Sequence, residues 1–319
     1  MGDGPFPIAP CPGLQWKAIS PTLRATSSRG VTMTFSSLSE FLSAGRKTLA
    51  KGPIAIILME DEVEVDSTLR HHLDAGFRQV VAIGLPDIKV AETLAPQIVR
   101  VHHDALADNI LTDAVNGVID AAPGQWICYA YNAEYLFFPF CETRKVGEML
   151  AFSMEERRDS LLTYVVDLYA GDLSAHPDAV SMEDAHLDKS GYYALARRDK
   201  TNAIAERQLD FYGGLRWRFE EHVPPPRRRI DRISLFRARP GLRLQPDHTF
   251  NVAEYNTYAC PWHNSLTAAM CSFRTAKALR RNAGSAPHIR TFKWRNSAPF
   301  QWHSQQLLDL GLMEPGQWF

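Results

Sequence analysis

The stretch QWICYAYNAEYLFFPF, residues 125–140, places an apolar run, a polar turn and an aromatic run in direct succession. A strand is predicted over residues 125–130, since 126–130 are hydrophobic without alternation, which is typical of a strand buried on both faces of a parallel sheet. Asn132 and Glu134 follow where such a strand would end. The aromatic run 135–140 is best explained as packing in the core. This stretch therefore favours a chain built on a parallel sheet.

Similar apolar runs recur upstream, separated by segments with helical periodicity. Strands are predicted over residues 53–58 and 79–84, and helices over 35–49, 65–75 and 106–119. Gly76 follows the second of these helices directly and suits a helix C-terminus. Parallel strands need crossovers of about a dozen residues, and these intervals supply them. The pattern predicts an α/β fold in which helices flank a mostly parallel sheet.

Polar residues follow two of the predicted strands. Glu60 and Asp61 come after residues 53–58, and Asn132 and Glu134 come after residues 125–130. Parallel sheets bind ligands outside the carboxyl ends of their strands, so these four side chains are expected to face one crevice. Acids at the start of a helix also complement its dipole, which is an equally good explanation for Glu60 and Asp61.

The rest of the chain is less regular. Strands are predicted over 161–167, 191–195 and 230–237, and helices over 265–281 and 304–310. Residues 1–32 are rich in Pro, Gly, Ser and Thr, and are expected to form an irregular arm. The predicted organisation is that arm, one main domain over 33–281, and an irregular C-terminal extension or lid over 282–319.

Composition excludes several classes of protein. The 319 residues include 35 Lys plus Arg and 36 Asp plus Glu, so there is no basic excess of the kind that nucleic-acid binders show. Every apolar run is shorter than the ~18 residues that cross a bilayer, so no membrane span is expected. Five cysteines without a close pair fit reduced thiols, and no secretory signal is evident at the N-terminus. We expect a cytoplasmic protein.

A series of short motifs resembles family 2 glycosyltransferases of the GT-A fold, in particular their bacterial branch. The resemblance covers roughly residues 53–275 and rests on the order of the motifs. They are His71-His72-Leu73-Asp74-Ala75-Gly76, Trp126, Glu134-Tyr135-Leu136, Asp167-Leu168-Tyr169, Gly191-Tyr192-Tyr193, Gly213-Gly214-Leu215-Arg216-Trp217-Arg218, Asp231-Arg232-Ile233-Ser234-Leu235-Phe236 and Asp247-His248.

The resemblance implies a nucleotide-sugar donor and a Mg²⁺ or Mn²⁺ ion held by an Asp-X-Asp motif. Here Tyr131 and Ala133 occupy the two Asp positions, which leaves Glu134 as the implied metal ligand. Ser272-Phe273-Arg274 also stands where the branch has His-Phe-Lys. Hard cations of this kind prefer carboxylate oxygens, so the motif predicts a weakened metal site.

Fixed cations could neutralise the leaving diphosphate instead of a metal. Arg216 and Arg218 are two residues apart and would share one face of a strand. Further candidates are Arg227, Arg228, Arg229, Lys293 and Arg295. Together with Arg216 and Arg218, the residues expected to bind the donor are Glu60, Asp61, Asn132, Gly213 and Gly214. The two glycines suit a tight turn as well as a close approach to a ligand.

A base must take the proton from the acceptor hydroxyl in an inverting transfer, and Asp210 and His248 are the candidates near the family-like motifs. A cysteine nucleophile, Cys260 with His263, has weak support because nothing marks an oxyanion site.

The sequence thus predicts a glycosyltransferase that uses a nucleotide-sugar donor and an unknown acceptor, with or without a metal. Two alternatives remain open. One is a non-catalytic relative that binds a nucleotide or sugar in a regulatory or scaffold role. The other is a metal-independent transferase whose C-terminal tail closes over the donor and brings Lys293, Arg295 and His303 with it.

Overall fold

A nine-stranded sheet organises the part of the chain that the computed structural model describes, residues 33–199 and 201–318. In sheet order its strands are β1 (Met33–Phe35), β4 (Val99–His102), β3 (Gln79–Gly84), β2 (Ile54–Leu58), β5 (Trp126–Tyr131), β12 (Asp231–Arg237), β7 (Ser160–Asp167), β13 (Ala268–Ser272) and β6 (Glu134–Phe137). Strands β12 and β6 run antiparallel to their neighbours, and the other pairings are parallel. The predicted mostly parallel α/β sheet is confirmed, whereas the predicted arm over 1–32 lies outside the described residues.

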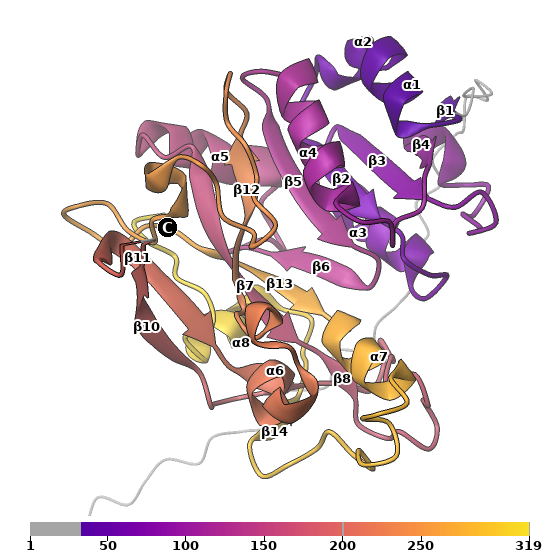
Figure 1. The fold of residues 1–319 in the computed structure, drawn as a ribbon, viewed down its shortest axis with the longest axis vertical. Coiled ribbons are helices and arrows are strands. Elements are labelled where there is room, and N and C mark those ends of the chain that lie inside the picture. The colour runs from indigo at the N-terminus through magenta and orange to yellow at the C-terminus, as the bar shows by residue number, and fades with distance from the viewer. Residues whose placement is uncertain (1–32, 200, 319) are drawn as a thin grey trace, which may run out of the picture. The chain divides into compact units, whose positions relative to one another are not determined.

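Helices cover both faces of the parallel half, whose indigo to magenta elements lie at the upper right of Figure 1. Ile54, Ile56 and Leu58 alternate along β2 and share a core with one set of helices. These are α1 (Leu38–Ala44), α2 (Arg46–Leu49) and α4 (Ile110–Ala121). Ala55 and Ile57 point to the other face. They pack with α3 (Val65–Ala75) and α5 (Val146–Glu155). Because both faces are covered, β2 is apolar at every position.

Helix α3 ends where the sequence predicts. Gly76 has φ +100° and its backbone N–H donates to the carbonyl of Leu73 at 3.0 Å, which closes the last turn. A side chain at that φ would be strained, so glycine suits the position.

The C-terminal half adds two small sheets. The hairpin of β10 (Tyr193–Arg198) and β11 (Ile204–Tyr212) lies at the left of Figure 1. The second sheet has the order β14 (Ser297–Pro299), β9 (Ala185–Asp188) and β8 (Tyr169–Ala170). Residues of the predicted extension are integral to this packing, since Phe292 is fully buried in one core cluster with Tyr169, and Leu307 of α8 (Ser304–Asp309) is fully buried in another with Leu187. The boundary at 281/282 stays a prediction.

Two predicted elements are wrong. Residues 265–281 are not one helix, because β13 pairs with β7 and β6 before α7 (Arg274–Arg281) begins. Arg216 and Arg218 do not lie on a strand, since α6 (Gly214–Arg218) follows the end of β11. Gly213 makes this turn possible, because a Cβ there would lie 2.1 Å from the Tyr192 ring.

The sheet is split at its carboxyl edge, between β5 and β12. Their pairing ends at Cys128 and Leu235, so residues 129–131 of β5 pair only with β2. The register of β12 against β7 also shifts between Arg232 and Leu235, as a bulge does. The split leaves room between the two halves of the sheet for side chains at this edge.

Candidate functional site

The carboxyl edge of the sheet brings the four predicted polar residues together. The backbone N–H of Glu60 donates to Asn132 Oδ1 at 2.9 Å, and Asn132 Nδ2 donates to Asp61 Oδ1 at 2.5 Å. Asn132 itself is fully buried. The turn after β2 and the turn after β5 are thus held side by side, so Glu60, Asp61 and Asn132 lie together, whereas the crevice that they were expected to face stays a prediction. Glu134 begins β6 at the same edge, opposite Ser272 of β13.

Glu134 forms a buried ion pair with Arg232 inside the split. Arg232 Nη2 lies 2.5 Å from Glu134 Oε2, and the two side chains are 4% and 0% exposed. Ser272 Oγ and the N–H of Tyr131 also donate to the carboxylate, at 2.9 and 3.0 Å. Burial works to raise the pKa of Glu134, but attraction by Arg232 outweighs it and the pKa lies below its ordinary value. Both carboxylate oxygens are therefore engaged.

These contacts do not fit a divalent cation. A metal at Glu134 would have to replace Arg232, and the buried guanidinium would then lose its partner. Within the described residues there is no group of three His, Cys, Asp or Glu that could hold an ion. The prediction that Glu134 ligates Mg²⁺ or Mn²⁺ gains no support from its surroundings.

Helix α7 presents three cations to the acidic turn after β2. Arg274 donates to both oxygens of Glu60, at 2.6 and 2.8 Å. Lys277 Nζ lies 3.0 and 3.1 Å from the two oxygens of Asp61, and Arg281 also pairs with Asp61. Residues three and four apart lie on one helix face, so these cations form a single row.

Burial and charge act on this row in opposite directions. Lys277 is 3% exposed, and burial lowers its pKa although Asp61 opposes the shift. For Asp61, burial raises the pKa, but Lys277 and the hydrogen bonds outweigh it and leave the pKa below its ordinary value. The Arg274 guanidinium lies over the Tyr131 ring, 3.7 Å from its centroid, a cation–π contact that fixes the fork in place. The row is held rigidly at the edge of the sheet.

His248 lies against Tyr129, whose ring centroid is also 5.5 Å from the Arg232 guanidinium. The two rings stack with centroids 5.9 Å apart, and Tyr129 Oη lies 3.1 Å from His248 Nδ1. Burial lowers the pKa of His248 to about 3, with Arg232 and Arg274 adding to the effect. His248 is therefore neutral near pH 7. A neutral imidazole can accept a proton, but so low a pKa makes it a weak base.

Asp210, the other candidate base, belongs to a separate ion-pair group on the hairpin. It lies 2.7 Å from Arg197 Nε and 3.1 Å from Arg229 Nη1. Both arginines also approach Asp231, which is buried. The contacts of Asp210 are thus those of a structural link between β11 and the start of β12.

Gly214 and Arg216 lie beside a buried aspartate, Asp167, at the end of β7. A Cβ on Gly214 would lie 2.9 Å from Asp167 Oδ2, and Arg216 Nε lies 3.6 Å from Oδ1. Burial raises the pKa of Asp167, and Arg216 opposes the shift. Arg218 instead donates from Nη1 to both oxygens of Asp188, each at 3.1 Å. Both arginines therefore hold buried carboxylates.

The remaining predicted cations do not join the row on α7. Arg228 pairs with Glu220, and Arg229 with Asp210. Lys293 and Arg295 are exposed, and His303 lies 3.5 Å from Glu142. His263 pairs with Glu156 at 2.6 Å, and the Ser265 hydroxyl donates to Cys260 Sγ at 3.7 Å.

Sequence reasoning missed Arg232, Lys277 and Arg281 as members of the site. A signal was available, because Arg274, Lys277 and Arg281 recur at helical spacing directly after the departure Ser272-Phe273-Arg274 from the family pattern. Their partners in the turn after β2 lie more than two hundred residues away in the sequence.

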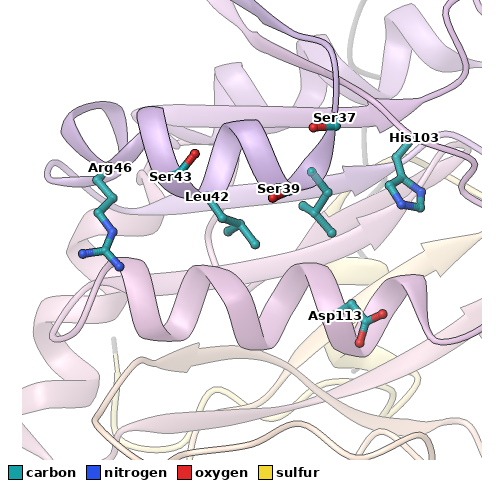
Figure 2. Close-up of a pocket in the computed structure, with 8 residues that line it drawn as sticks. Ser37, Ser39, Leu42, Ser43, Arg46, His103 and Asp113 are labelled. Carbon is teal, nitrogen blue, oxygen red and sulfur yellow. The ribbon is translucent and has the colours of Figure 1, made fainter.

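A surface hollow of about 560 Å³ lies elsewhere, at the outer strands of the sheet. Figure 2 shows it between α1 and α4, with Leu42 and Arg46 on one side and Asp113 on the other. None of the residues that line it belongs to the carboxyl-edge cluster. We place the candidate site at the cluster, because charged side chains from several elements far apart in the sequence converge there.

No protein-family model matches this sequence, and no curated protein matches it. Among solved structures, the fold is similar to one described as UTP-bound UGPase from Acinetobacter baumannii. The TM-score is 0.32 at 8% identity, over 74% of this chain and 95% of that chain. A likeness at this level carries no argument about function. Among the helices of the described chain, none has the length and apolar character that crossing a bilayer requires.

Proposed function

We propose that the chain is a GT-A-like, metal-independent glycosyltransferase of family 2 type, which binds a nucleotide-sugar donor at the cation row of α7. The observation that carries the proposal is the row itself. Arg274, Lys277 and Arg281 lie on one helix face at the carboxyl edge of a mostly parallel sheet, where such sheets bind ligands. The motif order from residue 53 to residue 275 supports the same class of ligand.

The chemistry of the row suits the leaving group of a sugar transfer. A nucleoside diphosphate develops negative charge as the glycosidic bond to it breaks, and fixed cations at that place stabilise the charge. The guanidinium forks of Arg274 and Arg281 match phosphate geometry, and Lys277 adds a point charge. The acceptor hydroxyl would lose its proton to a nearby base, for which His248 is better placed than Asp210. A cytoplasmic location remains part of the proposal.

Thermal unfolding tests the donor site directly. A nucleoside diphosphate should raise the unfolding midpoint in EDTA, because a ligand at a hundred times its Kd adds about 2.7 kcal/mol to the stability of the folded state. Adding Mn²⁺ should leave that shift unchanged. Lys277→Met should reduce the shift strongly. Arg243→Met is the matched control, since Arg243 is an exposed cation paired with Asp120. A shift that appears only with Mn²⁺ would contradict the metal-independent proposal.

A non-catalytic role in binding a nucleotide or sugar is the second candidate, favoured by one observation. Asp210 and Glu134, two carboxylates predicted to take part in the chemistry, are both held by arginines. Incubation with a panel of nucleotide sugars separates the two candidates. Release of free nucleoside diphosphate supports the transferase, and stabilisation without any release supports the binding protein.

A further inference from the structure

We propose that Glu60 and Asp61 form an intramolecular lock on the cation row, so that the site selects a diphosphate over a single phosphate. The inference rests on the proposed function, since it concerns the same row. The two carboxylates occupy the donors that an anionic ligand would need. A ligand therefore binds by displacing them, and its affinity is set by that competition.

The lock is one unit because both carboxylates come from a single turn. Glu60 and Asp61 are adjacent, between β2 and α3, and Asn132 fixes this turn through Glu60 N and Asp61 Oδ1. The N–H of Val63 also donates to Asp61 Oδ1, at 2.9 Å. Movement of this one turn would uncover all three cations.

The ion pairs are accessible enough for a ligand to compete with them. The side chains of Arg274 and Arg281 are 35% and 50% exposed, and those of Glu60 and Asp61 are 14% and 18% exposed. A pair in such a position is stabilised by Coulomb attraction that water partly screens. Lys277 is the exception, because it is almost wholly buried and would be left unpaired if Asp61 left without a replacement.

Two separate carboxylates imply a ligand with two linked anionic groups. Arg274 and Lys277 are three residues apart, so their Cβ atoms lie about 5–6 Å from each other on the helix surface. Because the turn moves as one unit, a single phosphate that displaces it would pair with only one end of the row and leave the cations at the other end without a partner. A diphosphate can replace both carboxylates, because its two phosphoryl groups are covalently joined and the second contact is intramolecular.

Binding of inorganic pyrophosphate and inorganic phosphate, measured by calorimetry, tests the lock without knowledge of the nucleoside. The wild-type protein should prefer pyrophosphate. Asp61→Asn keeps an oxygen for the N–H of Val63 but removes the charge that holds Lys277 and Arg281. It should tighten phosphate and pyrophosphate binding by about fivefold, on the scale of a lost partly exposed ion pair. Glu60→Gln should act in the same direction through Arg274.

Glu62→Gln is the matched control. Glu62 is the next residue of the same turn and is exposed, so the substitution removes the same charge without opening either ion pair. Its affinities should equal those of the wild type. Circular dichroism confirms folding, and Glu60→Gln serves as the test if Asp61→Asn does not fold.

The possible outcomes separate the lock from the proposed function. Tighter binding by Asp61→Asn or Glu60→Gln, with Glu62→Gln unchanged, supports the lock. Unchanged or weaker binding by both variants, while the wild type binds pyrophosphate, overturns the lock and leaves the anion site intact. If neither the wild type nor any variant binds pyrophosphate or a nucleoside diphosphate, the cation row is not an anion site and the proposed function fails with it.

Discussion

The two halves of the chain stabilise the same sheet by different means. Among the described residues up to 131, Arg100 is the only buried residue that carries a charge, and it donates to the backbone carbonyls of Leu85 and Ile88. Beyond residue 131 the buried charged side chains are Glu134, Arg158, Asp167, Asp188, Asp231, Arg232 and Lys277. The interior of the first half is almost entirely apolar, whereas the interior of the second half also contains ion pairs.

This difference teaches where function can reside. Apolar burial is non-directional and contributes stability in proportion to area. A buried ion pair adds little net stability compared with apolar residues of the same shape, so its presence calls for another explanation. The pairs Glu134–Arg232 and Asp167–Arg216 lie at the carboxyl edge, and Lys277 belongs to the cation row itself. The contrast supports the interpretation that the first half is a rigid scaffold and that the carboxyl edge of the sheet carries the function.

The largest effect should come from breaking the pair inside the split. Glu134→Ala leaves the Arg232 guanidinium buried without its carboxylate, and should lower the free energy of unfolding by about 3–5 kcal/mol. Urea denaturation measures this. The double variant Glu134→Ala/Arg232→Met should recover much of the loss, because no unpaired charge remains. If Glu134→Ala is as stable as the wild type, the second half does not depend on its buried ion pairs, and the contrast between the halves fails.

Lowering the pH should destabilise the first half, because this half buries a histidine, His72, in its neutral form. His72 is fully buried, and burial lowers its pKa to about 3. The unfolded chain therefore binds a proton near pH 6.5 that the folded chain does not, so stability falls as pH falls. The loss from pH 7 to pH 5 should be about 2 kcal/mol.

The variant His72→Leu isolates this contribution. It should lose about 2 kcal/mol less than the wild type between the same two pH values, as measured by chemical denaturation at each. Equal losses in both proteins would show that His72 is protonated in the folded state.

Removing one methyl group from the apolar scaffold should have a smaller effect. Ile56→Val in β2 should cost about 1 kcal/mol, since Ile56 is fully buried in the core shared with α4. The cost should be the same in low and in high salt, because no charge is involved. A strong salt dependence would contradict the interpretation that apolar contacts alone stabilise the first half.

The smallest effect should come from an ion pair on the surface. Asp120→Ala removes the partner of Arg243, and the two side chains are 53% and 44% exposed. The change in unfolding free energy should be about 0.5 kcal/mol or less, and salt should reduce it further. A change as large as that of Glu134→Ala would show that burial does not set the strength of these pairs.

The parallel half was predictable from the sequence because each of its main strands is a continuous apolar run. Residues 54–58, 79–84 and 126–131 form strands close to the predicted bounds. Strand β13 was not predictable in the same way. Its sequence, Ala268-Ala269-Met270-Cys271-Ser272, contains Ala and Met, which favour helices, and lacks β-branched residues. Pairing with β7 and β6 overrides that local preference.

The position of Glu60, Asp61 and Asn132 could be predicted from the ends of the strands, since the carboxyl ends of parallel strands meet at one edge. The position of the basic side chains could not be predicted, because α7 reaches this edge only through the pairing of β13. The same applies to Arg232, whose contact with Glu134 depends on the antiparallel direction of β12 and on the bulge between Arg232 and Leu235. The helical spacing of Arg274, Lys277 and Arg281 indicates a basic helix face, but nothing local in the sequence shows what that face or Arg232 contacts.

The split has a consequence for the local stability of the sheet. Strands β5 and β12 join the two halves of the sheet through only three residue pairs, from Trp126–Arg237 to Cys128–Leu235. A ladder with three pairs should open more readily than the five-pair ladder between β2 and β3. Amide hydrogens of that seam should exchange with deuterium sooner than those between β2 and β3.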